Sequence, residues 1–169
     1  MELLRKAMQQ DLDMRLQLHP KGGVFLEFLL EQGIYFTGNR FKGRRMTAKQ
    51  CFKNATHYAL RGDGLYYCEG LALSGELVKS GLILPMEHAW CCDDEGNVYD
   101  PTWQGGQQNI YCGVAFDSRI VAEAVCLKKH YGLFTHNFRY DEDLFQHIRS
   151  GKFPTKKFDN LSLPKAASS

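Results

Sequence analysis

Long apolar runs are missing from this sequence, and so is a strong excess of charge of either sign. A membrane-spanning helix needs about 18 consecutive apolar residues, and no stretch of the chain approaches that length. The first 19 residues are charged throughout and lack the apolar centre of a signal peptide. The formal net charge is only +2, so overall electrostatics call for neither a nucleic acid nor a membrane as partner. We therefore expect a cytoplasmic protein that does not bind membranes.

The spacing of the cysteines does not match the common metal-binding patterns. The chain has six cysteines but no C-x-x-C pair, and Cys91 and Cys92 are adjacent, so their side chains would point to opposite faces of a strand. The H-x-E and P-C-x-x-C pattern of zinc deaminases is also missing. We expect reduced thiols, mostly buried, and neither a metal nor another cofactor. A metal site built from His88 and nearby cysteines is the weaker alternative.

Repeats, linkers and low-complexity blocks are absent as well. A chain of 169 residues with 44% apolar content suits one soluble domain. We expect this domain to span residues 1–160 and to be followed by a disordered tail over residues 161–169.

Helical patterns occupy the two ends of this domain. Apolar spacing predicts helices over residues 1–19 and 24–33. A third helix is predicted from Thr47, because Thr47 and Gln50 have the spacing of a capping box. Two more are predicted near the C-terminus, over residues 117–130 and 140–151, the first with an aspartate as its N-cap.

Between these helices the apolar period changes toward two. Four segments rich in aromatic and β-branched residues, separated by turn signals, predict strands over residues 65–73, 87–92, 97–100 and 111–116. Helices, then an antiparallel sheet, then helices is the order of a single α+β domain.

Cys51 is the best nucleophile candidate among the six cysteines. It falls in the first turn of the helix predicted from Thr47, where the positive end of the helix dipole favours a thiolate. A cysteine nucleophile needs a base from across a cleft, and the sheet is the natural source.

The segment EHAWCCDDEGNVYDPTW, residues 87–103, supplies such a base. A three-residue loop ending in a left-handed Gly96 would place Trp90 opposite Asp100. His88 and Asp100 would then share one face as diagonal neighbours. This register predicts a base and an orienting carboxylate side by side.

The motifs QCFKNA, YYCEGLAL and EHAWCCDDEGNVYDPTW, in this order, resemble the core of the transglutaminase-like branch of the papain-like cysteine enzymes. The resemblance covers residues 47–116, less than half of the chain, and small bacterial and phage-associated members are of similar size. It implies a nucleophile at a helix N-terminus packed on an antiparallel sheet, with N- and C-terminal helices. It also implies Cys51 as nucleophile, His88 as base and Asp100 as orienting acid.

The resemblance further implies acyl transfer from a carboxamide on a protein or peptide substrate. A glutamine deamidase or transglutaminase is the first expectation, and a thiol protease or amidase of the same fold is the alternative. No calcium loop is present in the sequence, so the acyl acceptor stays open.

Other residues are candidates for the substrate cleft. The helix-start amide of Cys51, and with less support the side chain of Gln50, could stabilise an oxyanion. Trp90 and Trp103 are read as core or cleft walls, and His57 is the reserve base. A non-catalytic binding protein is the remaining rival, because basic-aromatic stretches at residues 38–45 and 152–158 could contact nucleic acid or an acidic protein.

Overall fold

The computed structural model describes residues 1–19, 23–103, 108–136, 139–159 and 161. The predicted tail over residues 161–169 therefore lies outside the described residues, apart from Leu161. Within the described residues, no helix is both long enough and apolar enough to cross a membrane.

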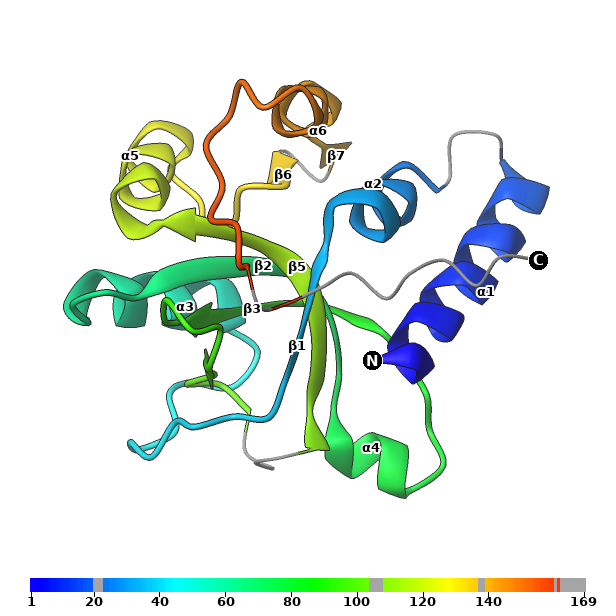
Figure 1. Ribbon diagram of the computed structural model, residues 1–169, viewed down its shortest axis with the longest axis horizontal. Helices are drawn as coiled ribbons and strands as arrows, with labels where there is room; N and C mark the ends of the chain where they lie inside the picture. The colour runs from blue at the N-terminus through cyan, green and yellow to red at the C-terminus, as the bar shows by residue number, and fades with distance from the viewer. Residues whose placement is uncertain (20–22, 104–107, 137–138, 160, 162–169) are drawn as a thin grey trace.

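An antiparallel sheet of five strands forms the centre of the molecule, in the order β1-β5-β2-β3-β4 (Figure 1). Its strands are β1 (Ile34–Thr37), β2 (Tyr66–Leu73), β3 (Met86–Cys92), β4 (Val98–Tyr99) and β5 (Ile110–Asp117). A separate small hairpin consists of β6 (Thr135–His136) and β7 (Arg139–Tyr140).

Helices cover one face of this sheet. The described helices are α1 (Glu2–Leu18), α2 (Val24–Gln32), α3 (Cys51–Arg61), α4 (Gly75–Lys79), α5 (Ser118–Lys128) and α6 (Glu142–Arg149). All except α4 contribute buried residues to the larger hydrophobic core, together with side chains such as Tyr67 and Phe116 from the sheet. The opposite face carries a smaller core around Trp90 and Tyr111.

These observations confirm the predicted α+β class and most of the predicted elements. The five predicted helices correspond to α1, α2, α3, α5 and α6, and the four predicted strands to β2 through β5. The N-cap prediction for α5 is also confirmed, because the Asp117 side chain accepts from the Arg119 backbone N–H. The short elements β1, α4, β6 and β7 were not predicted, because segments of two to five residues are too short to show a period.

The predicted helix start at Thr47 is wrong. α3 begins at Cys51 and has Gln50 as its N-cap, with no side-chain capping hydrogen bond. Lys49 has a φ of 61°, in the left-handed region, so a right-handed helix cannot run through it. The Thr47 carbonyl instead accepts from the Asn54 side chain at 2.7 Å. The correction places Cys51 at the very first helical residue.

Two paired glycines make room for the smaller core. Gly70 and Gly113 face each other across β2 and β5, and Gly70 is also paired with His88 on β3. A Cβ atom on Gly113 would lie 2.7 Å from the Trp90 ring, which is closer than carbon atoms can approach. Trp90 can therefore lie over the sheet only because this position has no side chain.

Candidate functional site

The first helical turn of α3 and the β3–β4 hairpin bring Cys51, His88 and Asp100 together. α3 packs on β3. In the hairpin, Cys92 pairs with Val98 and Cys91 with Tyr99. Gly96 has a φ of 79°, as the predicted three-residue loop requires. The predicted register, with His88 and Asp100 on one face, is confirmed.

His88 and Asp100 form a buried pair. The Nε2–H group of His88 donates to Oδ2 of Asp100 at 2.8 Å, and the two side chains are 2% and 0% exposed. Because an ionised carboxylate can only accept, this contact fixes the proton on Nε2. The remaining ring nitrogen, Nδ1, is the one available to Cys51, a half-buried side chain close enough to the His88 ring to help raise its pKa.

The surroundings of His88 shift its pKa upward. Burial disfavours the charged ring, but the hydrogen bonds and charges of Asp100 and Cys51 outweigh it and raise the pKa of His88 to about 9. The imidazolium form is thus favoured by the two groups between which the ring lies. Such a ring can accept a thiol proton and hold it near the sulfur.

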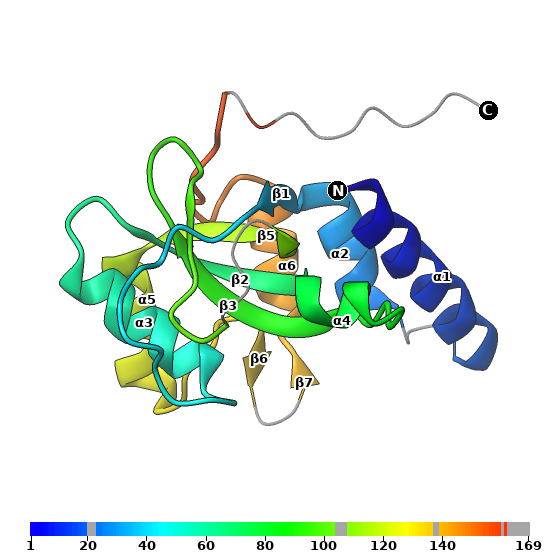
Figure 2. The same cartoon turned by 90° about the horizontal axis from the view of Figure 1, so that it is seen from below.

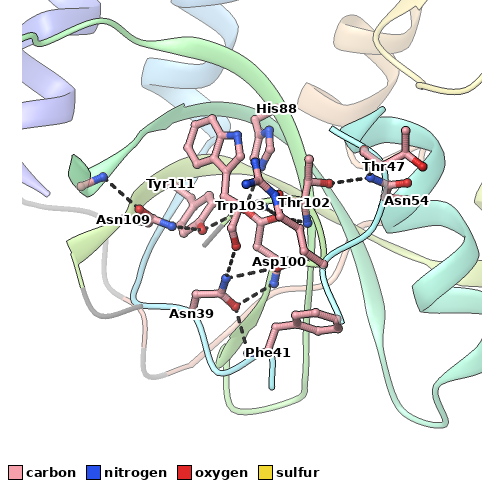
Figure 3. Close-up of polar contacts among 12 residues, drawn as sticks. Asn39, Phe41, Thr47, Asn54, His88, Asp100, Thr102, Trp103, Asn109 and Tyr111 are labelled. Atoms are coloured by element: carbon pink, nitrogen blue, oxygen red, sulfur yellow. Dashed lines mark hydrogen bonds and ion pairs between the residues drawn. The ribbon is translucent and has the colours of Figure 1, made fainter. Parts of the chain in front are cut away.

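Asp100 is held by three donors besides His88 (Figure 3). Its Oδ1 accepts from the backbone N–H groups of Thr102 and Trp103 at 2.8 and 3.0 Å. Its Oδ2 accepts from the Tyr111 hydroxyl at 3.1 Å. The carboxylate therefore has a fixed orientation, and with it the plane of the His88 ring is fixed.

Asn39, from the segment after β1, clamps the backbone that carries Asp100. Its side-chain oxygen accepts from the Asp100 N–H at 2.9 Å, and its side-chain nitrogen donates to the carbonyls of Asp100 and Trp103 at 3.1 Å each (Figure 3). Sequence reasoning missed this residue, because Asn39 precedes Asp100 by 61 positions and no local pattern links them.

A second asparagine ties α3, the helix that begins at Cys51, to the same segment. The buried side chain of Asn54, on α3, donates to the Thr102 hydroxyl at 3.0 Å (Figure 3). Thr102 lies two residues after Asp100. This buried contact therefore joins the helix that begins with Cys51 to the segment that carries Asp100. The spacing of Asn54 one turn after Cys51 was the only sequence signal that could have pointed to it.

The two tryptophans differ in position. Trp103 stacks on the His88 ring with centroids 3.9 Å apart and an interplanar angle of 21°, and it is partly exposed. Trp90 is fully buried and lies farther from His88, with centroids 6.5 Å apart. Trp103 therefore stays a candidate cleft wall, whereas Trp90 belongs to the core. Gln50 is exposed next to Cys51, and its oxyanion role stays a prediction.

The loop before β6 lies beside the start of α3. Glu69 is buried beneath it and accepts from the backbone N–H groups of Leu133 and Phe134 at 2.7 and 3.0 Å. Burial raises the pKa of Glu69, although these hydrogen bonds oppose the shift. A Cβ atom on Gly132 would touch Phe52, the residue after Cys51, so this loop packs against the first turn of α3.

His57, the reserve base, points elsewhere. Its Nε2 lies 3.0 Å from the hydroxyl of Tyr131, a residue of the same loop. Nothing in these contacts connects it with Cys51. His88 is therefore the base candidate that the geometry favours.

The remaining cysteines lie in other surroundings. Cys68 and Cys92 are buried with their sulfur atoms 3.2 Å apart, and Cys91 donates to the Ala55 carbonyl. Cys126 is exposed on α5. Over the part of the chain that the structure describes, no three His, Cys, Asp or Glu side chains are grouped so as to hold a metal ion.

Comparison of the chain with protein-family models, curated proteins and solved structures gave no significant match.

Proposed function

We propose that this protein is a cysteine-dependent acyl-transfer enzyme that acts on the carboxamide of a protein or peptide, as a glutamine deamidase or a transglutaminase. One observation carries the proposal. The His88 ring is held between the Asp100 carboxylate and Cys51, the first residue of a helix. A nucleophile, a base and a group that orients the base are the parts that covalent acyl transfer needs.

The first half of the reaction forms a thioester. The thiol proton of Cys51 passes to Nδ1 of His88, and the sulfur attacks the carboxamide carbon. The amide N–H groups of the first turn of α3 have no acceptor within the helix, so they can donate to the negatively charged substrate oxygen and stabilise it. The carbon–nitrogen bond then breaks, and His88 returns the proton to the departing ammonia.

The second half resolves the thioester. His88 takes a proton from water or from a primary amine, which attacks the thioester carbon, and the carbon–sulfur bond breaks. Water leaves a carboxylate, and an amine leaves a new amide. Asp100 keeps the ring in the Nε2–H tautomer through both halves. Trp103, stacked on His88, limits the ring to one orientation.

The intact masses of products separate these outcomes. Glutamine-containing proteins are incubated with the enzyme, with and without a primary amine. A deamidase exchanges NH₂ for OH, a transglutaminase adds the amine, and a thiol protease cuts the chain. We expect carboxamide modification by the wild type and by Cys126→Ala, a matched exposed-thiol control, and none by Cys51→Ala. Equal activity of Cys51→Ala and wild type would contradict the proposal.

Thiol reactivity tests the rival of a non-catalytic binding protein. Brief alkylation followed by peptide mass mapping compares Cys51 with Cys126. Cys126 is the more exposed thiol, so simple access predicts that it labels first. A thiol paired with His88 would react faster than its exposure alone predicts, because the thiolate is the reactive form. We expect Cys51 to label first, and first labelling at Cys126 with Cys51 untouched would favour the binding protein.

A further inference from the structure

Basic side chains lie around the N-terminus of α3, and no Asp or Glu residue lies among them in the sequence. Residues 32–62 contain seven of the chain's 21 Lys and Arg residues and none of its 19 Asp and Glu residues. The rest of the chain therefore has 14 basic residues against 19 acidic ones. The net charge of +2 hides a strongly uneven distribution. We call six of the seven the cationic rim: Arg40, Lys42, Arg44, Arg45, Lys49 and Lys53.

The side chains of the cationic rim face the solvent. All six residues are exposed. Among the described residues, none of the six takes part in a salt bridge. The guanidinium of Arg45 donates to a backbone carbonyl, that of Thr102. Like charges on one strip repel each other and do not stabilise the fold, so the clustering points to a partner of opposite charge.

The rim is fixed beside the catalytic residues. The backbone N–H of Arg40 donates to the Val98 carbonyl at 2.7 Å, and that of Met46 donates to the Pro101 carbonyl at 2.8 Å. These two contacts attach the basic segment to the residues on either side of Asp100.

Lys49 and Lys53 lie two residues before and two residues after Cys51, on the segment that turns into α3. In both orientations of the molecule, this segment and α3 lie on the side away from α1 and α4 (Figures 1 and 2).

We propose that the cationic rim docks an acidic polypeptide segment that carries the target carboxamide. This inference rests on the proposed function. A carboxamide that reaches Cys51 comes close to the exposed Lys49 and Lys53 on either side of it in the chain. Asp or Glu residues flanking the carboxamide would therefore raise the rate of encounter and fix its position.

The aromatic residue in the strip favours a polypeptide over a nucleic acid. Proteins that bind single strands present aromatic faces on which bases stack. Phe41, between Arg40 and Lys42, instead packs edge-to-face on Tyr58 with centroids 5.2 Å apart. Its ring is thus engaged with α3.

Binding to the Cys51→Ala protein tests the proposal without any chemistry. The probe is a fluorescein-labelled peptide with one central glutamine flanked by Asp and Glu, and its partner probe has Ser at every acidic position. Fluorescence anisotropy at low salt should show the acidic peptide binding roughly tenfold or more tightly than the Ser peptide, and the advantage should shrink as salt rises.

A pair of charge reversals identifies the surface. Lys42→Glu with Arg44→Glu changes two exposed rim residues, and Lys6→Glu with Lys79→Glu makes the same net change on α1 and α4. The rim variant should lose most of the preference for the acidic peptide, roughly tenfold or more, and the control should change by about twofold or less. Circular dichroism and thermal unfolding will show whether both variants are folded.

Three results of the binding experiments would overturn the proposal. They are equal binding of the acidic and Ser peptides, a preference that survives the rim reversal, and tighter binding of a single-stranded RNA or DNA oligonucleotide that the rim reversal abolishes. The last would make a nucleic acid the partner of the rim. If wild-type enzyme modifies both peptides equally well, the rim proposal fails and the proposed function stands. An unreactive Cys51 removes the function and leaves the binding result to be judged by itself.

Discussion

Two carboxylates are buried in this molecule in nearly the same way, on opposite faces of one sheet. Glu69 lies on the helix-covered face and accepts from the backbone N–H groups of two consecutive residues, Leu133 and Phe134. Its third donor is the hydroxyl of Tyr67, at 2.7 Å. All three donors are neutral, and burial raises the pKa of Glu69.

Asp100 repeats this arrangement and adds one partner. It too accepts from two consecutive backbone N–H groups, those of Thr102 and Trp103, and from one hydroxyl, that of Tyr111. Its fourth donor is His88, which in turn contacts Cys51. The comparison shows that backbone and tyrosine donors fix a buried carboxylate in place. In the proposed reaction only Asp100 takes part, because its partner His88 is titratable and lies beside Cys51, whereas Glu69 holds a loop in place.

Removing the histidine should have the largest effect. Because His88→Ala deletes the proposed base, we expect carboxamide modification to fall by a factor on the order of 10⁴ or to background. Activity of purified variant and wild type measures this, and far-UV circular dichroism checks the fold. His57→Ala is the matched control, since its ring contacts Tyr131. A similar loss in the control would favour His57 as the base.

Exchanging each carboxylate for its amide separates their roles. Asp100→Asn should lower activity by roughly 10² to 10⁴, because an amide can present the wrong group to Nε2. Glu69→Gln should lower activity far less but reduce the free energy of unfolding by about 1–3 kcal/mol, since it leaves a buried donor without an acceptor. Activity assays and urea unfolding of both variants measure the two effects. Equal activity losses would end the distinction between the two sites.

The two tyrosine donors offer a finer comparison. Tyr111→Phe removes one donor from Oδ2 of Asp100, so the carboxylate binds the His88 proton more strongly and the pKa of His88 should rise further above about 9. Tyr67→Phe removes the same group from Glu69 and should leave the His88 titration unchanged. NMR titration of the His88 ring measures both. An unshifted pKa in Tyr111→Phe would show that this hydroxyl does not tune the base.

The smallest expected effect is a pH dependence of stability. Because the pKa of His88 is raised from about 6.5 to about 9 by folding, its protonation stabilises the folded state. That contribution is complete below about pH 6.5 and is lost as the pH rises through about 9. Urea unfolding of wild type and His88→Gln should show a stability difference that narrows over this window. A difference that grows with pH would mean that the pKa of His88 is lowered instead.

Local chemistry made much of the fold and part of the site predictable. The β3–β4 register follows from the turn ending at Gly96, and this register alone brings His88 and Asp100 to one face. The start of α3 was predicted four residues too early, because the capping-box spacing at Thr47 is also found where no helix begins. The left-handed backbone at Lys49 prevents a helix from starting before Cys51.

The sequence by itself determined the amphipathic helices, the strand periods and the hairpin geometry, because each depends on residues within a few positions of one another. Tertiary structure decided which polar groups surround His88 and Asp100. The Asn39 clamp, the Asn54 contact with Thr102 and the Tyr111 hydroxyl on Asp100 join residues that are 61, 48 and 11 positions apart. Whether such polar groups meet depends on how helices and strands pack, and packing is set by burial of apolar area, which has no direction of its own.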